Sequence, residues 1–496
     1  MKKLPLLLLL AASVSCSTTR GLPEGRYLLS SSKVAVKGDD GPRVGEVSTY
    51  VRQQPNFTIF GWNPFIGIYN WSDGSGRGLN PLWEKIGTAP VVFDPVQMQA
   101  SASAMRTRLE YLGYYGAKVT PEVVFKGKKA SVLYLVEPGC RHRIDSLIFE
   151  VPEGEFEEDF RRDSSALGIR TGDPLSEKSL EAETVRGAAY FRNLGYYNFN
   201  KNHYFFEADT LSGKTILHYG IRNYTRNESP SSAVPPVRYR IGDVRIHYPS
   251  TIRFRESMLE SFNNIRPGEL YSEKLVNSTY YRFSGLNVFN SVNIEMTPSD
   301  SAVVDCDIRL SGSNVFGFKV NLEASSNSSG LLGASPQLTF FHKNLFRGGE
   351  LLNLGFTGNW QFKPGTDVRS TEYGASASIS FPKALGYSSK WIEGHDNIPR
   401  TEIKASFNYQ NRPEYRRSIA GLSYGYTGQS GRNIFYQFYP IQLNLVKLYA
   451  IGEEFQETLM GNPYLWDSFE DQIDAGVGGT FYYTTNSDIV PKTPYH

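Results

Sequence analysis

The chain has 496 residues, of which 40% are hydrophobic and 21% are charged, enough for about three or four domains of ordinary size. Its formal net charge of +2 lacks the basic excess of a nucleic-acid-binding protein, so we expect no nucleic-acid partner. Three Cys can form neither a disulfide framework nor a four-Cys zinc site. Past residue 15 there is no run of about 18 apolar residues, which excludes a helical membrane protein but not one that crosses with strands.

The N-terminus carries the pattern of an export signal. Lys2 and Lys3 precede an apolar run at 4–12 and then small residues, so 1–15 is predicted to be a signal peptide. The stretch Ser13-Val14-Ser15-Cys16 resembles a bacterial lipobox, in which the Cys is lipidated, with Ser13 where Leu is usual. We therefore expect lipidation at Cys16, a lipid-anchor linker over 16–25 and an extracytoplasmic protein. The alternative is an ordinary secretory signal with an incidental Cys.

A short motif occurs three times in the following part of the chain. Leu112-Gly113-Tyr114-Tyr115 is repeated as Leu194-Gly195-Tyr196-Tyr197, and a looser copy is centred on Gly285. Each copy ends a helical pattern and opens a strand. The Gly is predicted to stop the helix because it adopts the left-handed conformation at little cost, and the aromatic residues that follow suit a sheet.

The segments around this motif also recur, in the order β-α-α-β-β. The second and third copies share a Ser-Glu-Lys helix start at Ser176 and Ser272. We place the three units at 26–138, 141–223 and 237–311, with a linker at 224–236 and an aromatic-rich insertion at 57–82 in the first unit. The predicted strands are 27–36, 118–125, 130–136, 143–151, 197–208, 214–222, 239–248, 292–297 and 302–310, and the predicted helices are 45–53, 96–112, 155–167, 176–194 and two that begin at 253 and 272.

From Val315 onwards apolar and polar residues alternate. In the first segment the alternating apolar residues are Phe316, Phe318, Val320 and Leu322. Ten-residue alternation between turns is typical of a transmembrane β-barrel with its apolar side toward lipid, although a soluble sandwich also alternates. We predict about eight strands in 315–496, near residues 315, 336, 351, 372, 401, 418, 437 and 472, and an acidic helical loop at 452–470.

The turn between the second and third of these strands contains a motif. It reads Asn344-Leu345-Phe346-Arg347-Gly348-Gly349-Glu350, and the two consecutive glycines are predicted to supply the positive φ of a tight hairpin. The motif is similar to the Asn-Leu-Phe-Gly-Gly-Gly-Glu signature of BamA/TamA barrels, with Arg347 in place of a Gly. The β-α-α-β-β units with their hinge motif likewise resemble POTRA domains, the periplasmic repeats of that family. The alternative is an unrelated array of small α+β domains.

This resemblance covers nearly the whole chain and implies three α+β POTRA repeats followed by an antiparallel transmembrane β-barrel. Three repeats behind a lipid anchor are most similar to TamL, the lipidated TamA relative of Bacteroidota. The resemblance implies a bacterial outer-membrane protein with periplasmic POTRA units that assembles or inserts other outer-membrane proteins, without a cofactor. Its partners would be the bilayer, unfolded client proteins and a TamB-like periplasmic protein.

The resemblance also implies where clients bind. POTRA sheet edges would accept client strands by β-augmentation, and the first barrel strand, with Phe316, Phe318, Val320 and Leu322, would form one side of a seam where a client strand pairs. Two alternative functions are a two-partner secretion polypeptide translocator and a lipid-anchored surface protein that binds ligands through the aromatic insertion.

The barrel of this family has about sixteen strands, more than residues 315–496 can supply at roughly ten residues each plus turns. The chain ends at Pro494-Tyr495-His496 rather than in an amphipathic strand with a terminal aromatic, and the family's Arg-Gly-Phe loop motif is absent. We therefore expect a truncated barrel with about eight of the sixteen strands, which could not close or insert properly by itself.

Motifs that would indicate chemistry are few. Gly421-Leu422-Ser423-Tyr424-Gly425 matches the hydrolase nucleophile elbow, but the surrounding alternation predicts one strand with Ser423 facing the lumen, whereas the elbow needs a strand, a turn and a helix. The seven His lack metal-ligand spacing. Cys140 and Cys306 are interpreted as small buried residues beside strands. We expect neither an enzyme nor a metal site.

Overall fold

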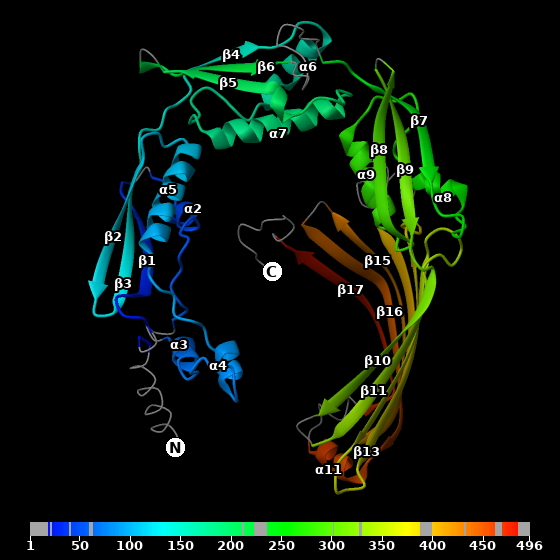
Figure 1. Cartoon of the computed structure of the whole chain (residues 1–496). Helices are drawn as coiled ribbons and strands as arrows, with labels where there is room; N and C mark the ends of the chain where they lie inside the picture. The colour runs from blue at the N-terminus through cyan, green and yellow to red at the C-terminus, as the bar shows by residue number, and fades with distance from the viewer. Residues whose placement is uncertain are drawn as a thin grey trace. The chain divides into compact units, whose positions relative to one another are not determined.

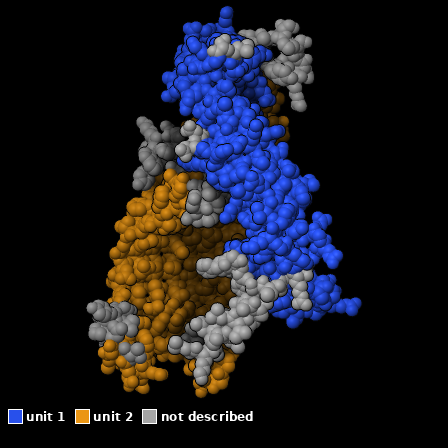
Figure 2. Space-filling model, turned by 90° about the vertical axis from the view of Figure 1, so that its left-hand side faces the viewer, with its two compact units in different colours: residues 1–190, 199–236 blue, residues 191–198, 237–496 orange. Residues whose placement is uncertain are grey.

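A computed structural model describes residues 18–19, 22–38, 41–58, 63–210, 213–222, 236–300, 302–326, 330–386, 399–430, 433–461 and 469–484. These residues form three α+β repeats and one eight-stranded antiparallel sheet, so the predicted class of repeats followed by antiparallel strands is confirmed. They divide into two compact units, one with residues 1–190 and 199–236 and the other with residues 191–198 and 237–496 (Figure 1, Figure 2). The predicted signal peptide, Cys16 and nearly all of the predicted linker lie outside the described residues.

All three repeats have the same sheet topology. Each sheet has three strands in the order first, third, second, with the first strand parallel to the third and the second antiparallel to it. A parallel pair needs a long crossover, which the helices between the first and second strands supply, whereas the antiparallel pair needs only a short turn. The shared topology confirms that the sequence repeat is a structural repeat.

The first repeat packs its long helix α5 (Pro95–Tyr111) against its sheet. Asp94 caps this helix by accepting a hydrogen bond from the Val96 N–H at 2.8 Å. Met105 and Leu109 of α5 are fully buried in one core with Tyr134 and other residues of the sheet. The other elements are β1 (Leu28–Val36), α2 (Val44–Ser48), α3 (Pro64–Tyr69), α4 (Asn80–Ile86), β2 (Lys118–Lys126) and β3 (Lys129–Glu137).

The second repeat contains a buried polar cluster formed by residues of its two helices and of its central strand. Arg186 donates to Asp163 at 2.9 Å and to Glu183 at 2.7 Å, and Glu183 also accepts from the Tyr219 hydroxyl at 3.0 Å. Both carboxyl groups are buried, so the guanidinium supplies the opposite charge that they require. The elements are β4 (Ser146–Glu150), α6 (Glu155–Asp163), a 3-10 turn η1 (Ser164–Ala166), α7 (Glu177–Asn193), a 3-10 turn η2 (Lys201–His203), β5 (Tyr204–Asp209) and β6 (Ile216–Ile221).

The central strand of the third repeat alternates between buried and more exposed residues. Val304, Cys306 and Ile308 on its central strand all point into the core and are fully buried, as their spacing predicts. Burial raises the pKa of the Cys306 thiol to about 12. The elements are β7 (Arg240–His247), α8 (Glu256–Phe262), α9 (Glu273–Ser284), β8 (Phe289–Asp300) and β9 (Val303–Gly312).

Eight strands follow in simple chain order, each paired with its sequence neighbours. The number of strands and their positions agree with the alternation of the sequence, and a short helix, α11 (Glu453–Met460), lies in the acidic loop. None of the helices in the described residues combines the length and apolarity that a membrane crossing requires. The strands are β10 (Phe316–Ser326), β11 (Leu332–His342), β12 (Leu351–Phe362), β13 (Arg369–Phe381), β14 (Arg400–Asn411), β15 (Tyr415–Ser430), β16 (Ile434–Ile451) and β17 (Gln472–Tyr483).

Two predictions about residues beside strands of the repeats are wrong. The aromatic residues after Gly195 do not open a strand, because β5 starts only at Tyr204 and the ring of Tyr196 is buried instead. Burying an aromatic ring removes a large apolar area from water, which outweighs the preference of the residue for a strand. Cys140 is exposed rather than buried, because β3 ends at Glu137 and leaves Cys140 in the following connection.

Candidate functional site: the junctions between modules

The first two hinge glycines lie where one module meets the next. Gly113 has a φ of +90°, and a Cβ at this position would lie 2.3 Å from the carbonyl oxygen of Leu175, which precedes α7 of the second repeat. Gly195 has a φ of +109°, and its carbonyl accepts a hydrogen bond of 2.8 Å from the Tyr239 N–H, which precedes β7 of the third repeat. Both positions therefore have the left-handed backbone that the sequence predicts.

Gly285, the third hinge glycine, also lies at the end of a helix, but it does not have the left-handed conformation of the other two. Its φ is −68°, within the right-handed helical region, so the predicted left-handed stop is wrong for this copy. The helix still ends here, because the Gly285 N–H closes the last turn on the Tyr281 carbonyl at 2.9 Å. Its own carbonyl accepts a hydrogen bond from the guanidinium of Arg400, at the start of β14. The third copy of the motif thus contacts the eight-stranded sheet.

The turn between β11 and β12 is held by two buried polar side chains. Asn344 is 6% exposed and Glu350 is 2% exposed. The Asn344 side-chain oxygen accepts from the Gly349 N–H at 2.9 Å, and one Glu350 oxygen accepts from the N–H groups of Phe346 at 3.1 Å and Gly348 at 2.9 Å. These bonds satisfy backbone donors that a turn of this shape would otherwise leave unpaired.

The two glycines of the turn serve different purposes. Gly349 has a φ of +81°, as predicted, but Gly348 does not have a positive φ. Gly348 is needed for space, because a Cβ there would lie 2.4 Å from both the Arg255 guanidinium and the Glu350 carboxylate. The second positive φ, +63°, belongs to Arg347, the residue that departs from the family signature.

The same two side chains attach the turn to the third repeat. The Asn344 amide donates to the Arg253 carbonyl at 2.9 Å, and Glu350 accepts from the Arg255 guanidinium at 2.7 Å. In addition, the Arg255 N–H donates to the Arg347 carbonyl at 2.9 Å. We call this set of contacts the turn clamp: Arg253 and Arg255 from the third repeat, and Asn344, Arg347 and Glu350 from the turn.

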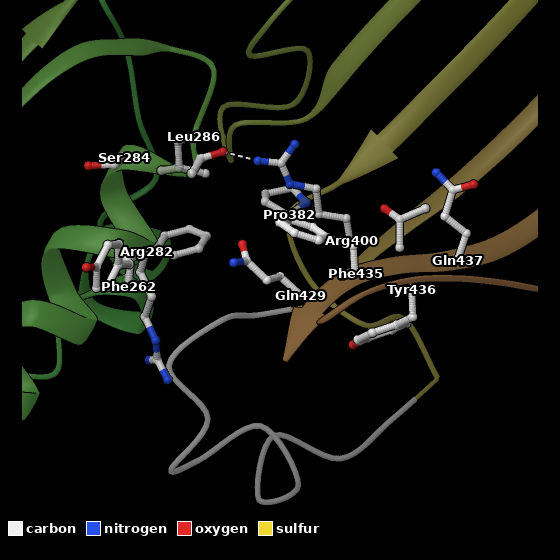
Figure 3. A pocket seen from close by; sticks show the side chains of 14 residues that line it. Phe262, Arg282, Ser284, Leu286, Pro382, Arg400, Gln429, Phe435, Tyr436 and Gln437 are labelled. Atoms are coloured by element: carbon white, nitrogen blue, oxygen red, sulfur yellow. Dashed lines mark hydrogen bonds between the residues drawn. The ribbon is translucent and has the colours of Figure 1, made fainter. Parts of the chain in front are cut away.

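A cavity of about 550 Å³ opens beside the contact between Gly285 and Arg400 (Figure 3). One wall comes from the end of α9 and includes Arg282, and the other comes from the ends of β13 to β16 and includes Gln429 and Tyr436. The third repeat and the sheet therefore meet at two places, the turn clamp at β11–β12 and this cavity at β14. The lining is mixed, with apolar residues such as Phe262 and Phe435 beside polar ones, and Arg282 and Arg400 give its polar part a basic bias.

The predicted seam strand β10 is an edge of the sheet. It pairs with β11 over its whole length and with no other strand among the described residues. Its predicted outward residues, Phe316, Phe318, Val320 and Leu322, are 66% to 74% exposed. An edge strand offers backbone N–H and C=O groups to a further strand, and here it also presents an apolar face.

The motifs considered for chemistry are not assembled into a site. Ser423 lies within β15 and is paired with Lys404 and Gln442 on the neighbouring strands, as the alternation predicts for a strand residue. Among the described residues no three His, Cys, Asp or Glu side chains are grouped as metal ligands. The sequence analysis did not predict the roles of Arg253, Arg255 and Arg400. A charged residue beside a turn does not by itself indicate a contact with another module.

Comparisons with known proteins found similar solved structures. No family model and no curated protein matches the sequence. The chain is similar to the BamA POTRA3-5 structure of Haemophilus influenzae, with 14% identity over 59% of this chain and 99% of that one and a TM-score of 0.32. It is similar to BamA from Haemophilus ducreyi lacking POTRA domains 1-3, with 12% identity over 71% of this chain and a TM-score of 0.39.

A third similar structure is CdiB from Acinetobacter baumannii, with 11% identity over 64% of this chain and a TM-score of 0.27. The chain spans 61% of the Haemophilus ducreyi BamA structure and 63% of CdiB.

Proposed function

We propose that the chain is an outer-membrane assembly or translocation factor, in which the eight-stranded sheet belongs to a transmembrane barrel and the three repeats hold unfolded client segments. One observation carries this proposal: the sheet has an apolar face and a polar face that are continuous across all eight strands.

The strand register aligns residues of one kind in rows across the sheet. The apolar row is Val320, Leu338, Phe356, Ala375, Phe407, Ala420, Leu445 and Ile473. The neighbouring row is polar or Gly throughout: Lys319, Thr339, Gly355, Ser376, Ser406, Gly421, Asn444 and Asp474. Because adjacent residues in a strand point to opposite faces, the two rows lie on opposite sides of the sheet.

The apolar face is open rather than packed. Val320 is 66% exposed and Ile473 is 77% exposed, at opposite ends of the same row. A soluble sandwich would bury such a face against a second sheet, and an apolar patch of this extent is unfavourable in water. Hydrocarbon chains of a bilayer would cover it without any partner chain, which favours the barrel over the sandwich.

Client strands have two kinds of edge to pair with. In the sheet, β10 offers a free edge whose apolar side chains would lie in lipid, so that a client strand paired there keeps its backbone bonded in the membrane. In the repeats, the outer strands β2 and β8 contain Pro121 and Pro298, which lack the N–H that a further strand would need. The outer strand β5 and the first strand of each sheet, β1, β4 and β7, contain no proline, so we assign client capture to these edges in all three repeats.

We infer the position in the cell from the N-terminal pattern together with two other motifs. Export with lipidation at Cys16, outer-membrane localisation with periplasmic repeats, and a TamB-like partner are supported by the resemblance of the lipobox, the hinge repeat and the Asn-Leu-Phe turn to TamL-like proteins. The same resemblance favours the assembly of several outer-membrane proteins over the export of a single polypeptide.

The proposal is tested by proline substitutions in β10 in cells that depend on this protein. Phe318→Pro and Val320→Pro each remove one backbone donor of the edge strand, so we expect the levels of many outer-membrane proteins to fall. Phe318→Leu keeps an apolar side chain and Ser423→Ala changes only a lumenal hydroxyl, so both should keep normal levels. Equal levels in all four strains would exclude client pairing at β10, and loss of one exported polypeptide alone would indicate a translocator.

A further inference from the structure

The aromatic insertion of the first repeat presents an apolar surface that client binding does not use. Helix α4 buries none of its residues, and Leu79, Leu82 and Ile86 are 62%, 46% and 46% exposed. Their spacing of i, i+3 and i+7 places them on one face of the helix. Phe65 and Trp71, near the two ends of α3, are also exposed.

These side chains lie on an ordered pair of helices. A Cβ at Gly87, just after α4, would lie 2.5 Å from the backbone nitrogen of Tyr69, so the end of α4 packs closely on α3. Trp71 and Trp83 form an edge-to-face pair with ring centroids 5.3 Å apart. Figure 1 shows α3 and α4 next to each other beyond one end of β1. The exposed face is therefore a fixed surface rather than an extended loop.

The covalent structure limits how far this surface can be from the proposed lipid. Leu22 is buried in a small cluster with Leu28 and with Ile66 of α3. Leu22 lies six positions after Cys16, and six extended residues span at most about 21 Å. Acyl chains on Cys16 would thus hold α3 and α4 beside the bilayer surface.

The composition of the insertion fits an apolar membrane contact. Residues 63–86 contain two acidic residues, Asp73 and Glu84, and two basic ones, Arg77 and Lys85, so their net charge is zero. Such a surface is not suited to steer a charged partner, whereas Trp, Phe and Leu side chains are those that enter the membrane interface.

We propose that Leu79, Leu82 and Ile86, together with Phe65 and Trp71, insert into the interface of the bilayer that carries the lipid of Cys16. This proposal rests on the proposed lipidation. The insertion would give the first repeat a second membrane contact beside its acyl chains.

The test places a polarity-sensitive dye on the full chain in vesicles of phosphatidylethanolamine and phosphatidylglycerol at a 3:1 ratio (roughly a bacterial mixture). The dye is attached at Leu82→Cys in a Cys140→Ser background, and nitroxide-bearing lipids serve as quenchers. We expect a blue shift and at least about threefold quenching at position 82, unchanged at high salt because the surface is neutral. A dye at Thr107→Cys, exposed on α5 of the same repeat, should show neither.

Two further variants separate the outcomes. With the dye at Leu79→Cys, the changes Leu82→Glu and Ile86→Glu should reduce quenching about tenfold. A dye at Ala375→Cys reports on the sheet. Quenching at Ala375 but not at Leu82 would overturn the insertion proposal and leave the proposed function intact. Protection of Leu82 from aqueous iodide without lipid quenching would also overturn it, in favour of a protein or glycan partner. Quenching at neither position would contradict the membrane sheet itself.

Discussion

Arg347 has a backbone conformation that is unusual for a residue with a Cβ. Its φ of +63° lies in the left-handed region, where a side chain with a Cβ costs about 1 kcal/mol or more relative to Gly. The turn clamp holds it there, because the Arg347 carbonyl accepts from the Arg255 N–H and its own N–H donates to Asn344 at 3.3 Å. The side chain itself is exposed, so the clamp uses only the backbone of Arg347.

Arg347→Gly should therefore stabilise the turn by about 1 kcal/mol, because it removes the strain and keeps every backbone contact of the clamp. Protease cleavage at the β11–β12 turn of the full chain, followed in increasing urea, measures the effect. Arg347→Ala keeps the Cβ and serves as the control, which should show little change. A loss of stability in the Gly variant would mean that the side chain contributes a contact.

His203 is a residue through which pH should act on the second repeat. Its ring stacks on Phe199 with centroids 4.8 Å apart, and burial lowers its pKa below the ordinary value of about 6.5. The folded protein thus favours the neutral ring, so the unfolded chain binds the proton more readily. The stability that this group contributes is present above about pH 6.5 and is lost as the pH falls through that value toward the folded pKa.

Hydrogen exchange of the β5 and β6 amides in the full chain measures this dependence. After correction for intrinsic exchange rates, protection should fall between pH 7.5 and 5.5 (a range of about two units around the ordinary pKa) in the natural protein, and it should fall less in His203→Gln. The Arg222 N–H, which donates to the His203 carbonyl at 2.8 Å, is a suitable local probe. Identical pH profiles for the two proteins would rule out His203 as the titrating group.

At the scale of elements, a buried polar cluster joins α6 and α7 of the second repeat. Arg186→Met would leave the carboxylates of Asp163 and Glu183 buried beside each other without their cation, which costs about 3–5 kcal/mol. Arg161→Met is the matched control on α6, because Arg161 pairs with Glu157 at the surface and its loss should cost no more than about 0.5 kcal/mol.

Proteolysis of the second repeat in urea, within the full chain, compares the two Arg variants. If they lose the same stability, the buried pairs contribute no more than an exposed one, and the cluster would have to be solvated.

The sequence predicts helices and strands well where apolar residues recur with a single period. The alternation of apolar and polar residues located the eight strands, and the repeated hinge motif located the three small sheets. In a strand, a face that must be buried or lie in lipid requires an apolar residue at every second position, and in a helix it requires one at every third or fourth position. Contacts between modules leave no such period. Gly113 and Gly195 looked like helix stops, although a Cβ at Gly113 would also clash with Leu175 of the next repeat. The turn clamp depends on Arg253 and Arg255, which are distant in sequence from Asn344 and Glu350, so a single sequence cannot pair them.

At the scale of the whole molecule, we expect a charge added to the apolar face of the sheet to impair membrane insertion and the same charge on the polar face to have little effect. Ala375 and Ser376 are neighbours on β13, in the apolar row and the polar row respectively. In the proposed barrel, Ala375→Arg would place a cation in hydrocarbon at a cost of about 2–4 kcal/mol near the bilayer centre, whereas Ser376→Arg would place it in a polar environment at little cost.

The amount of protein that resists extraction of membranes with alkaline carbonate measures insertion. It should fall for Ala375→Arg and stay near the natural level for Ser376→Arg. The reverse order would place lipid on the polar side of the sheet, and equal values would argue for a sheet that is not in a membrane.

The short connection between the third repeat and the sheet has a mechanical consequence. The central strand β9 ends at Gly312 and the edge strand β10 begins at Phe316, so only three residues join them. The turn clamp and the bond from Arg400 to Gly285 fix the same repeat at two more points. Three separate attachments leave no axis about which the repeat can swing freely. In the proposed function, a client segment that tilts the repeat would therefore transmit torque to the edge strand β10.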